Sequence, residues 1–379
     1  MILPYAIIFS IICLIFLGRG KIVGTNFSED TRFDKQALSL LFLFFYVLFA
    51  FKSYRVGADS WSYFSLYEQI SQLGFTQLSR FYVRFERGFV YYNKLLSLLF
   101  PHPQFLFIIS GVIILGVYYN LIKKYSKMLL LSTFLFFTLR IFDFSMSGIR
   151  QALAIAILVF SYSFVRKNKT IPFVFLVIVA TLFHRSAIVF LLAWFVNKVE
   201  ISKKILVVWI FGIIFSIISA SIVVSFLLSR GILHAFYADS RYFEGGVLAA
   251  PLLLIISLLI VVFSLVSKSY MEPNRENGVD IFDNKNMLIL QMIACVMLGF
   301  NLYFSILNRV ALNFNTFSII LVSNSLRSMR NTKYYALLYT AVIVLFALYF
   351  IVILIFRPTW TIYPFSFNQM FFIQMLGIR

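Results

Sequence analysis

The chain has 379 residues, of which 61% are hydrophobic and only 12% are charged. Soluble globular domains carry about 25% charged residues, so this composition excludes an ordinary water-soluble protein and indicates an integral membrane protein. The formal net charge is +19. No basic stretch lies in a water-soluble domain, so we assign the charge to cytoplasmic loops and anionic lipid rather than to nucleic acid.

The cysteines and the known motifs give no indication of a cofactor. Cys13 and Cys295 lie in apolar segments far apart in the sequence, and no HExxH, CxxC or glycine-rich phosphate motif occurs. We therefore expect no disulfide, no metal and no other cofactor. The first apolar segment, 2–17, follows no basic residues and has no clear small-residue cleavage site, which indicates a retained span rather than a signal peptide.

Apolar segments alternate with short polar loops along the chain. They cover roughly residues 2–17, 36–51, 104–121, 128–141, 150–165, 171–184, 186–197, 205–229, 248–267, 287–305, 309–326 and 334–356. Several are shorter than the ~20 residues that a straight helix needs to cross a bilayer. The sequence therefore predicts an all-α, polytopic membrane protein with about 11–13 transmembrane or re-entrant helices, in a single transmembrane domain over residues 1–379.

The basic residues divide the loops into two kinds. Of the 33 Lys and Arg residues, 19 fall in one set of loops, and 13 of these 19 are Lys. This set comprises loops 18–35, 122–127, 166–170, 198–204, 268–286 and 327–333, which we place in the cytoplasm because positive residues accumulate there. Of the other 14 basic residues, 12 are Arg. Topology does not require arginine on the outer side, and a guanidinium binds phosphate bidentately, so these arginines indicate a phosphate-binding function.

Two segments cannot be ordinary spans under this topology. Segment 89–100 is short, ends before Pro101 and precedes a descending span, so we predict an interfacial or re-entrant helix on the outer side. The run 171–196 has basic inner loops on both flanks, so it must leave the cytoplasmic side and return. Its 26 residues are too few for two full α-helical spans, so we expect a hairpin of two short helices with His184 at the tip. The alternative is one continuous helix, which would place His184 and Arg185 in hydrocarbon.

The predicted outer-face loop with its interfacial helix, 52–103, holds the densest group of candidate functional residues. Arg55, Asp59 and Tyr63 are spaced four apart, so Asp59 and Tyr63 share a helix face if Asp59 begins or lies in a helix. Glu86 stands just before the interfacial helix. The alternative is a solvated loop with ordinary ion pairs, but the many aromatic residues favour a platform bound at the membrane interface.

Further candidates stand at the outer ends of predicted spans. Arg150, followed by Gln151, opens a span, where its charge opposes the helix dipole unless an anion binds there. His184 is at the hairpin tip. The remaining candidates are Arg87, Arg185 and Arg309, with Arg241 and Tyr242 in a second outer-face loop, 230–247. The alternative in each case is structural: arginines that snorkel to the headgroups, and a histidine whose hydrogen bonds are satisfied internally.

These candidates form motifs in a definite order. The order is R-x-G-x-D-x-x-x-Y at 55–63, a Glu before a short apolar helix at 86, S-x-x-R-Q-x-x-A at 147–154, F-H-x-S at 183–186, R-Y at 241–242, and an Arg opening a span at 309. This ordered set resembles the EpsG family of Wzy-like exopolysaccharide polymerases, over nearly the full chain.

The resemblance implies a glycosyltransferase of GT-C-like architecture in the bacterial cytoplasmic membrane, with its active site on the outer face. The donor is a growing glycan on undecaprenyl diphosphate, the acceptor is another lipid-linked repeat unit, and further partners are membrane lipid and other polysaccharide export proteins. Fixed arginine charge would stabilise the departing diphosphate. The expected diphosphate-binding residues are Arg55, Arg150, Arg241 and Arg309. The expected substrate-binding residues are Tyr63, Arg87, Gln151, Arg185 and Tyr242.

The acceptor hydroxyl needs a base. A nearby arginine keeps Asp59 or Glu86 ionised and weakly basic, whereas a histidine titrates near the working pH. We therefore expect His184 or Asp59 to accept the proton and Glu86 to position the acceptor sugar. The rival functions are a lipid-linked oligosaccharide flippase or other transporter, a glycan ligase with the same donor chemistry, and a non-catalytic scaffold. Charge concentrated at one face, rather than at the midplane, disfavours a transporter.

Overall fold

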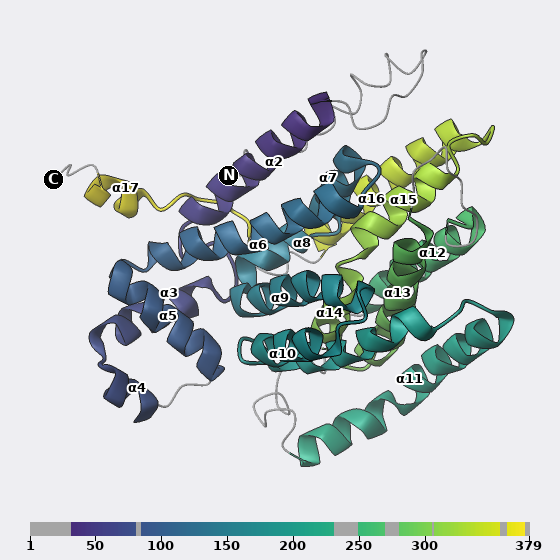
Figure 1. The fold of residues 1–379 in the computed structure, drawn as a ribbon. Helices are drawn as coiled ribbons and strands as arrows, with labels where there is room; N and C mark the ends of the chain where they lie inside the picture. Colours follow the sequence, from purple (N-terminus) through teal and green to yellow (C-terminus); the bar gives the residue numbers. More distant parts are fainter. Residues whose placement is uncertain are drawn as a thin grey trace. The chain divides into compact units, whose positions relative to one another are not determined.

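The computed structural model describes residues 32–80, 85–230, 249–269, 280–304, 307–356 and 362–375. The regular elements in these residues are all helices, as predicted (Figure 1). The one β contact among them is an isolated bridge between Lys52 and Phe367. The predicted first span, 2–17, and the second outer-face loop from residue 231 onward lie outside the described residues.

Six of the described helices are long and apolar enough to cross a membrane, so the chain is a multi-pass membrane protein. They are α2 (Arg32–Phe51), α6 (Gln104–Tyr125), α9 (Ile149–Arg166), α11 (Lys203–Ser229), α12 (Ala249–Ser267) and α16 (Tyr335–Phe356). The bent pair α7 (Leu129–Thr138) and α8 (Ile141–Ser147) adds a seventh span if it crosses as one. The other predicted segments form shorter or more polar helices, namely α10 (Thr170–Thr181), η1 (Arg185–Lys198), α13 (Ile281–Asn301), α14 (Asn308–Asn315) and α15 (Ser318–Ser328).

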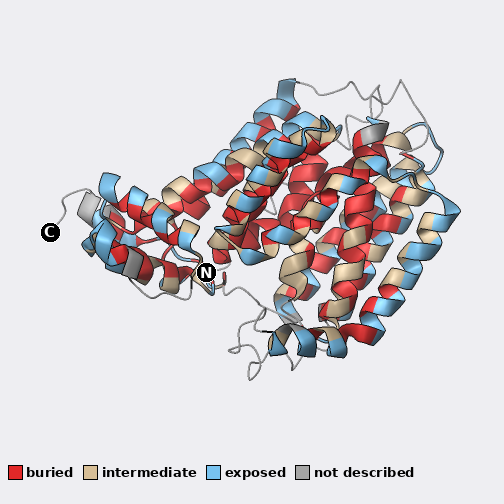
Figure 2. Ribbon diagram, turned by 60° about the horizontal axis from the view of Figure 1, so that its bottom comes forward, coloured by how far each residue is buried: buried red, intermediate tan, exposed pale blue. Residues whose placement is uncertain are grey.

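Packing divides the chain into two compact units. Unit 1 comprises Met1–Phe160, Phe175–Arg185 and Val342–Arg379, and unit 2 comprises Ser161–Val174 and Ser186–Ala341. Many helices bury one face and expose the opposite one (Figure 2), as expected where one side packs on neighbours and the other faces lipid or water. The single transmembrane domain expected from the sequence stays a prediction.

Aromatic side chains form the core of unit 1, where α2 packs against α6 and α7. Phe45 of α2 stacks on Phe137 of α7 and contacts Phe142 of α8. Tyr118 of α6 meets Phe136 of α7. All five side chains are buried, so large apolar areas fix these helices against one another.

Hydrogen bonds connect three segments at one end of unit 1. The Ser53 N–H donates to the Ser366 carbonyl at 2.8 Å, the Asn368 side-chain amide donates to Gln104 Oε1 at 2.7 Å, and Gln104 Nε2 donates to the Lys52 carbonyl at 3.1 Å. The end of α2, the start of α6 and the segment before α17 (Gln369–Met375) therefore lie together. The charge pattern assigns all three to the same side of the membrane. Which side faces the cytoplasm stays a prediction.

The predicted span 128–141 is not one straight helix. α7 ends at Thr138, Arg140 adopts the left-handed conformation with φ 61° and ψ 24°, and α8 continues at an angle of 52°. Arg140 pairs with Asp143 across the bend, and both side chains are buried. Hydropathy alone does not show that an ion pair one turn away allows an arginine to be buried.

The segment 171–196 forms two separate helices, as predicted, so the continuous helix is excluded. α10 ends at Thr181, and the N–H groups of Phe183 and His184 both bond to the Ala180 carbonyl. The chain then returns as η1, with Trp194 stacked on Phe173. η1 is a 3₁₀ helix of 14 residues. A 3₁₀ helix rises about 2.0 Å per residue, so η1 extends about 28 Å, close to the ~30 Å hydrocarbon core.

The loop between α2 and α6 is largely helical, with α3 (Ser60–Gln72), α4 (Phe75–Arg80) and α5 (Arg87–Leu99). α5 coincides with the predicted interfacial helix and packs against α3 and α6. Its other face exposes Tyr91, Leu95, Leu98 and Leu99. An exposed apolar face suits a helix at a membrane interface, but that placement stays a prediction.

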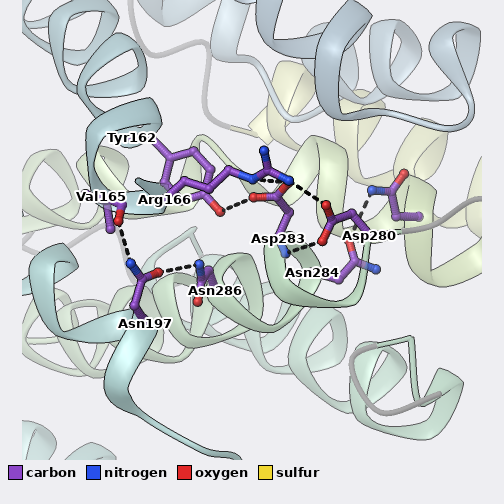
Figure 3. Close-up of polar contacts among 9 residues, drawn as sticks. Tyr162, Val165, Arg166, Asn197, Asp280, Asp283, Asn284 and Asn286 are labelled. Carbon is purple, nitrogen blue, oxygen red and sulfur yellow. Dashed lines mark hydrogen bonds and ion pairs between the residues drawn. The ribbon is translucent and has the colours of Figure 1, made fainter. Parts of the chain in front are cut away.

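In unit 2, α13 packs against α11, α12, α14 and α15. Polar side chains join the ends that the charge pattern assigns to the cytoplasm (Figure 3). Arg166 forms ion pairs with Asp280 at 2.6 Å and Asp283 at 3.0 Å, and the Tyr162 hydroxyl donates to Asp283 at 2.9 Å. Asn286 Nδ2 donates to Asn197 Oδ1 at 2.7 Å. The ends of α9 and η1 are therefore fixed to the start of α13.

Candidate functional site

The R-x-G-x-D loop, residues 53–59, lies against the end of α8 in unit 1. Gly57 has a φ of +104°, and a Cβ atom there would lie 3.0 Å from the Met146 carbonyl oxygen and 3.1 Å from the Ser147 Cα. Glycine alone suits this backbone and this close approach. The Ala58 N–H donates to Ser147 Oγ at 3.0 Å. The loop backbone is therefore held by α8.

Lys52 fixes the same loop from its buried side. The ammonium group is fully buried, donates to the Val56 carbonyl at 2.7 Å and to Ser60 Oγ, and lies 4.0 Å from the Phe107 ring centroid. Burial lowers the pKa of Lys52 well below its usual value, because desolvation disfavours the charged form. Lys52 is therefore a structural residue of this loop.

Asp59 begins α3, as the motif spacing suggested. It is the N-cap residue of the helix, and the Tyr63 hydroxyl donates to Asp59 Oδ2 at 3.4 Å. Asp59 is half-buried, whereas Tyr63 is 1% exposed. The two side chains share one face of the helix, so the tyrosine orients a carboxylate that solvent still reaches.

Arg150 and Glu86 form an ion pair beside this carboxylate. Arg150 Nη1 donates to Glu86 Oε2, and the two side chains are 14% and 13% exposed. The guanidinium lies 4.7 Å from the Phe85 ring centroid and 5.9 Å from that of Tyr63. Asp59 is near enough to interact electrostatically with Arg150. The starts of α3, α5 and α9 thus bring two carboxylates, a guanidinium and two aromatic rings together.

One atom of Arg150 is left without an acceptor. Nε of Arg150 is buried and has no hydrogen-bond partner in the part of the chain that the structure describes. A buried donor without a partner costs about 1–3 kcal/mol, more when charged. An anionic oxygen bound beside Arg150 would satisfy it.

The hairpin tip contacts the other oxygen of Glu86. The Arg185 N–H donates to Glu86 Oε1 at 3.3 Å. Gly88 makes this approach possible, because a Cβ atom there would lie 2.6 Å from the Leu182 Cβ. The half-buried His184 is adjacent in sequence to the residue that Glu86 holds. Glu86 therefore fixes both the start of α9 and the F-H-x-S tip.

Three further predicted site residues, Arg55, Arg87 and Gln151, differ in their surroundings. Arg55 is exposed, with its guanidinium 5.8 Å from the Tyr54 ring centroid. Arg87 Nη1 donates to the Leu78 carbonyl at 3.3 Å. Gln151 is 2% exposed and lies inside unit 1. Of the predicted diphosphate ligands in the described residues, Arg150 alone contacts Glu86.

The remaining predicted residues belong to unit 2 or lie outside the described residues. Arg309 is half-buried near the start of α14. On the same short helix, Asn313 Nδ2 donates to the Ser186 carbonyl at 3.0 Å, so the Ser of the F-H-x-S motif has a defined partner. Arg241 and Tyr242 lie outside the described residues.

Phe85, Gly88 and Lys52 were not recognised as site residues from the sequence. Gly88 had a detectable signal, because a glycine in the first turn of an amphipathic helix indicates close packing. Phe85 adjoins Glu86, but an aromatic residue in an aromatic-rich loop carries no specific signal. The sequence suggests that Lys52 is an ordinary exposed lysine of a loop, because its burial depends on Phe107, which is distant in the sequence.

The arrangement suits acid–base and anion chemistry. No group of three or more His, Cys, Asp or Glu side chains suited to a metal occurs in the described residues. A carboxylate such as that of Asp59 and an imidazole such as that of His184 have the chemistry of a proton acceptor, and Arg150 carries a fixed positive charge. Such a charge stabilises a departing anion without reorganisation.

Comparisons with known proteins identify the family. No curated protein and no solved structure matches the chain. The model of the EpsG family matches residues 36–367, which covers most of the chain and nearly all of its described helices. The chain therefore belongs to the EpsG family, as a multi-pass membrane protein linked to exopolysaccharide biosynthesis.

Proposed function

We propose that this protein is a polysaccharide polymerase. It transfers a growing glycan from undecaprenyl diphosphate to the non-reducing end of another lipid-linked repeat unit, on the outer face of the bacterial cytoplasmic membrane. The observation that carries the proposal is the group formed by Asp59, Glu86 and Arg150, with the unpartnered Nε of Arg150, in a chain of the EpsG family.

Arg150 is the central diphosphate ligand in this proposal. Its guanidinium has five N–H donors, and the contact with Glu86 uses Nη1. A phosphate oxygen at Nε would satisfy the buried donor. Arg55, Arg241 and Arg309 are proposed to complete the diphosphate site. Glycosyl transfer breaks the bond between the anomeric carbon and the diphosphate oxygen, so the negative charge grows next to the guanidinium.

Asp59 or His184 is proposed as the proton acceptor. The acceptor hydroxyl oxygen forms the new glycosidic bond to the anomeric carbon, and its proton passes to the base. Glu86 is proposed to position the acceptor sugar while holding Arg150 and the hairpin tip. Sugar rings would stack on the aromatic side chains of this region. The further substrate contacts are assigned to Tyr63, Arg87, Gln151, Arg185 and Tyr242.

The phenotype of cells that lack this protein separates the candidate functions. Loss of a polymerase leaves single repeat units on the lipid carrier at the outer face. Loss of a ligase leaves long chains that are not attached to their final acceptor, and loss of a flippase leaves no outer-face product. We expect single outer-face repeat units, which restored long chains should replace on complementation. Either of the other phenotypes would refute the proposal.

A further inference from the structure

A buried ion pair stands at the bend between α7 and α8, outside the group around Arg150. Arg140 is 2% exposed and Asp143 is 0% exposed, and Arg140 Nε donates to Asp143 Oδ2 at 2.9 Å. Every residue from Leu129 to Ile149 is buried except Leu139. Burying two charges costs desolvation that their attraction often fails to offset, so stability alone is a weak reason for such a pair. In a membrane protein, a charged pair inside a span is a candidate functional element.

The pair defines the corner of the broken span. Arg140 occupies the left-handed conformation at which the chain turns, and Asp143 lies in the first turn of α8. Two other segments of unit 1 surround the corner. Phe137 packs on Phe350 of α16 with ring centroids 4.9 Å apart. Tyr363, in the C-terminal segment, lies near both charges: burial raises its pKa most, the Asp143 carboxylate raises it further, and the Arg140 guanidinium lowers it. The ion pair therefore lies at the point where the chain turns from α7 into α8, which determines the direction of α8.

The last turn of α8 contacts the R-x-G-x-D loop of the candidate site. Ser147 Oγ accepts the Ala58 N–H at 3.0 Å. Ser60 Oγ, which donates to the Val56 carbonyl at 2.7 Å, also lies 3.4 Å from the Met146 carbonyl oxygen. These contacts bracket Asp59, the proposed base. Arg150 follows Ser147 by three residues, in the first turn of α9. A rotation of α8 would therefore move the proposed base and the proposed diphosphate ligand together.

We infer that Arg140 and Asp143 are positioning residues: their buried ion pair fixes the α7–α8 bend and so aligns Asp59 with Arg150. Arg140 and Asp143 pair with each other at the start of α8, whereas the contacts of α8 with residues 58 and 60 lie at its other end, so the pair acts through α8. The expected effect of the ion pair on turnover rests on the proposed polymerase function. The expected effect on the contact between Ala58 and Ser147 depends only on the geometry of α8.

Replacement of both charges separates positioning from stabilisation. Arg140→Met or Asp143→Leu alone leaves a buried charge without its ion-pair partner and should fold poorly, whereas the double variant R140M/D143L removes both charges and should keep a normal melting temperature. We expect its kcat for polymerisation to fall on the order of tenfold to a hundredfold, with KM for the lipid-linked acceptor changed by less than about threefold, because misalignment by about 1 Å has effects of that size. A wild-type kcat in a stable double variant would show that the pair is only structural.

Two further variants serve as controls for this experiment. Asp143→Glu keeps the ion pair but shifts the carboxylate by one methylene, so it should fold normally and lose part of kcat even if the double variant does not fold. A wild-type kcat for Asp143→Glu together with an unfolded double variant would overturn the inference. K285M/E200L removes an ion pair of unit 2, Lys285–Glu200, and should leave kcat unchanged.

Disulfide formation tests the geometry without any substrate. In a chain whose Cys13 and Cys295 are replaced by serine, Ala58→Cys and Ser147→Cys should form a disulfide rapidly on mild oxidation. Adding R140M/D143L should slow this reaction about fivefold or more, in keeping with a displaced α8. An unchanged rate would overturn the inference. If the wild-type protein makes no polymer while the disulfide still depends on the ion pair, the proposed function fails and the positioning role stands.

Discussion

The ion pair with Arg150 restricts the role that Glu86 can have in the candidate site. Both carboxylate oxygens of Glu86 accept hydrogen bonds, one from Arg150 and one from the Arg185 N–H, so Glu86 suits positioning better than proton transfer. Asp59 keeps partial exposure and a hydrogen bond from Tyr63. His184 adjoins the residue that Glu86 holds through the backbone. These contacts leave Asp59 and His184 as the proton acceptors to test.

Removal of the base should abolish most turnover while the protein still folds. Asp59→Asn and His184→Ala should each reduce polymer formation on the order of a hundredfold or more, the usual scale for losing a general base. Product length and protein level in isolated membranes measure this. Glu68→Gln, an exposed carboxylate on the same helix as Asp59, should keep full activity. If both variants still make long chains, neither residue is the base.

The buried Lys52 should make stability depend on alkaline pH. Burial lowers its pKa in the folded protein, so between that lowered pKa and the unfolded value near 10.4 the unfolded chain binds more protons. Unfolding free energy then rises with pH through this window. The melting temperature of the natural protein should therefore rise relative to Lys52→Met as pH increases in detergent solution. A difference that stays constant with pH would show that Lys52 is not desolvated.

At the scale of helices, Gly88 permits the contact between α5 and the end of α10. A methyl group at Gly88 would collide with Leu182 backbone and side-chain atoms at 2.6 Å, whereas one at Gly116 in α6 would meet nothing within 4 Å. Gly88→Ala should lower the melting temperature and reduce polymer formation, because Glu86 moves away from the hairpin tip. Gly116→Ala should be neutral or stabilising, since alanine favours helix by about 1 kcal/mol over glycine. Equal melting temperatures for the two variants would contradict the packing described here.

Periodicity and charge predicted those elements whose signal lies within the element itself. The start of α3 at Asp59, the helix before Pro101 and the turn near His184 follow from capping residues, proline and charge. The break at Arg140 and the 3₁₀ form of η1 depend on tertiary packing, which a hydropathy profile does not contain. Arg327 illustrates the same limit. It was assigned to a cytoplasmic loop, but it lies in α15 and is only 5% exposed.

At the scale of the whole chain, contacts join helix ends that the lysine and arginine pattern assigns to the same side. Lys52 and Phe367 form the bridge in unit 1, and Arg166 and Asp280 form an ion pair in unit 2. The candidate site was predictable in part: motif order indicated Asp59, Glu86, Arg150 and the hairpin tip. The pairing of Glu86 with Arg150 was not, because 64 residues separate them.

Impermeant thiol labelling of intact cells tests the topology. In a chain without its natural cysteines, Gln72→Cys and Ser366→Cys should react, because both positions are exposed and are predicted to lie outside. Lys167→Cys, exposed in a predicted inner loop, should react only after the membrane is permeabilised. Protection of Gln72→Cys or Ser366→Cys in intact cells would reverse or break the assignment.

Reconstitution of the purified protein with its lipid-linked repeat unit tests the central claim most directly. The account predicts a ladder of longer glycans, with one undecaprenyl diphosphate released for each repeat unit added. Arg150→Lys should lose most of this ladder because a bidentate grip is lost although the charge remains. Arg32→Lys, at an exposed position that begins α2, should give the wild-type ladder. The absence of a ladder from the wild-type protein, or equal ladders from the two variants, would contradict the account.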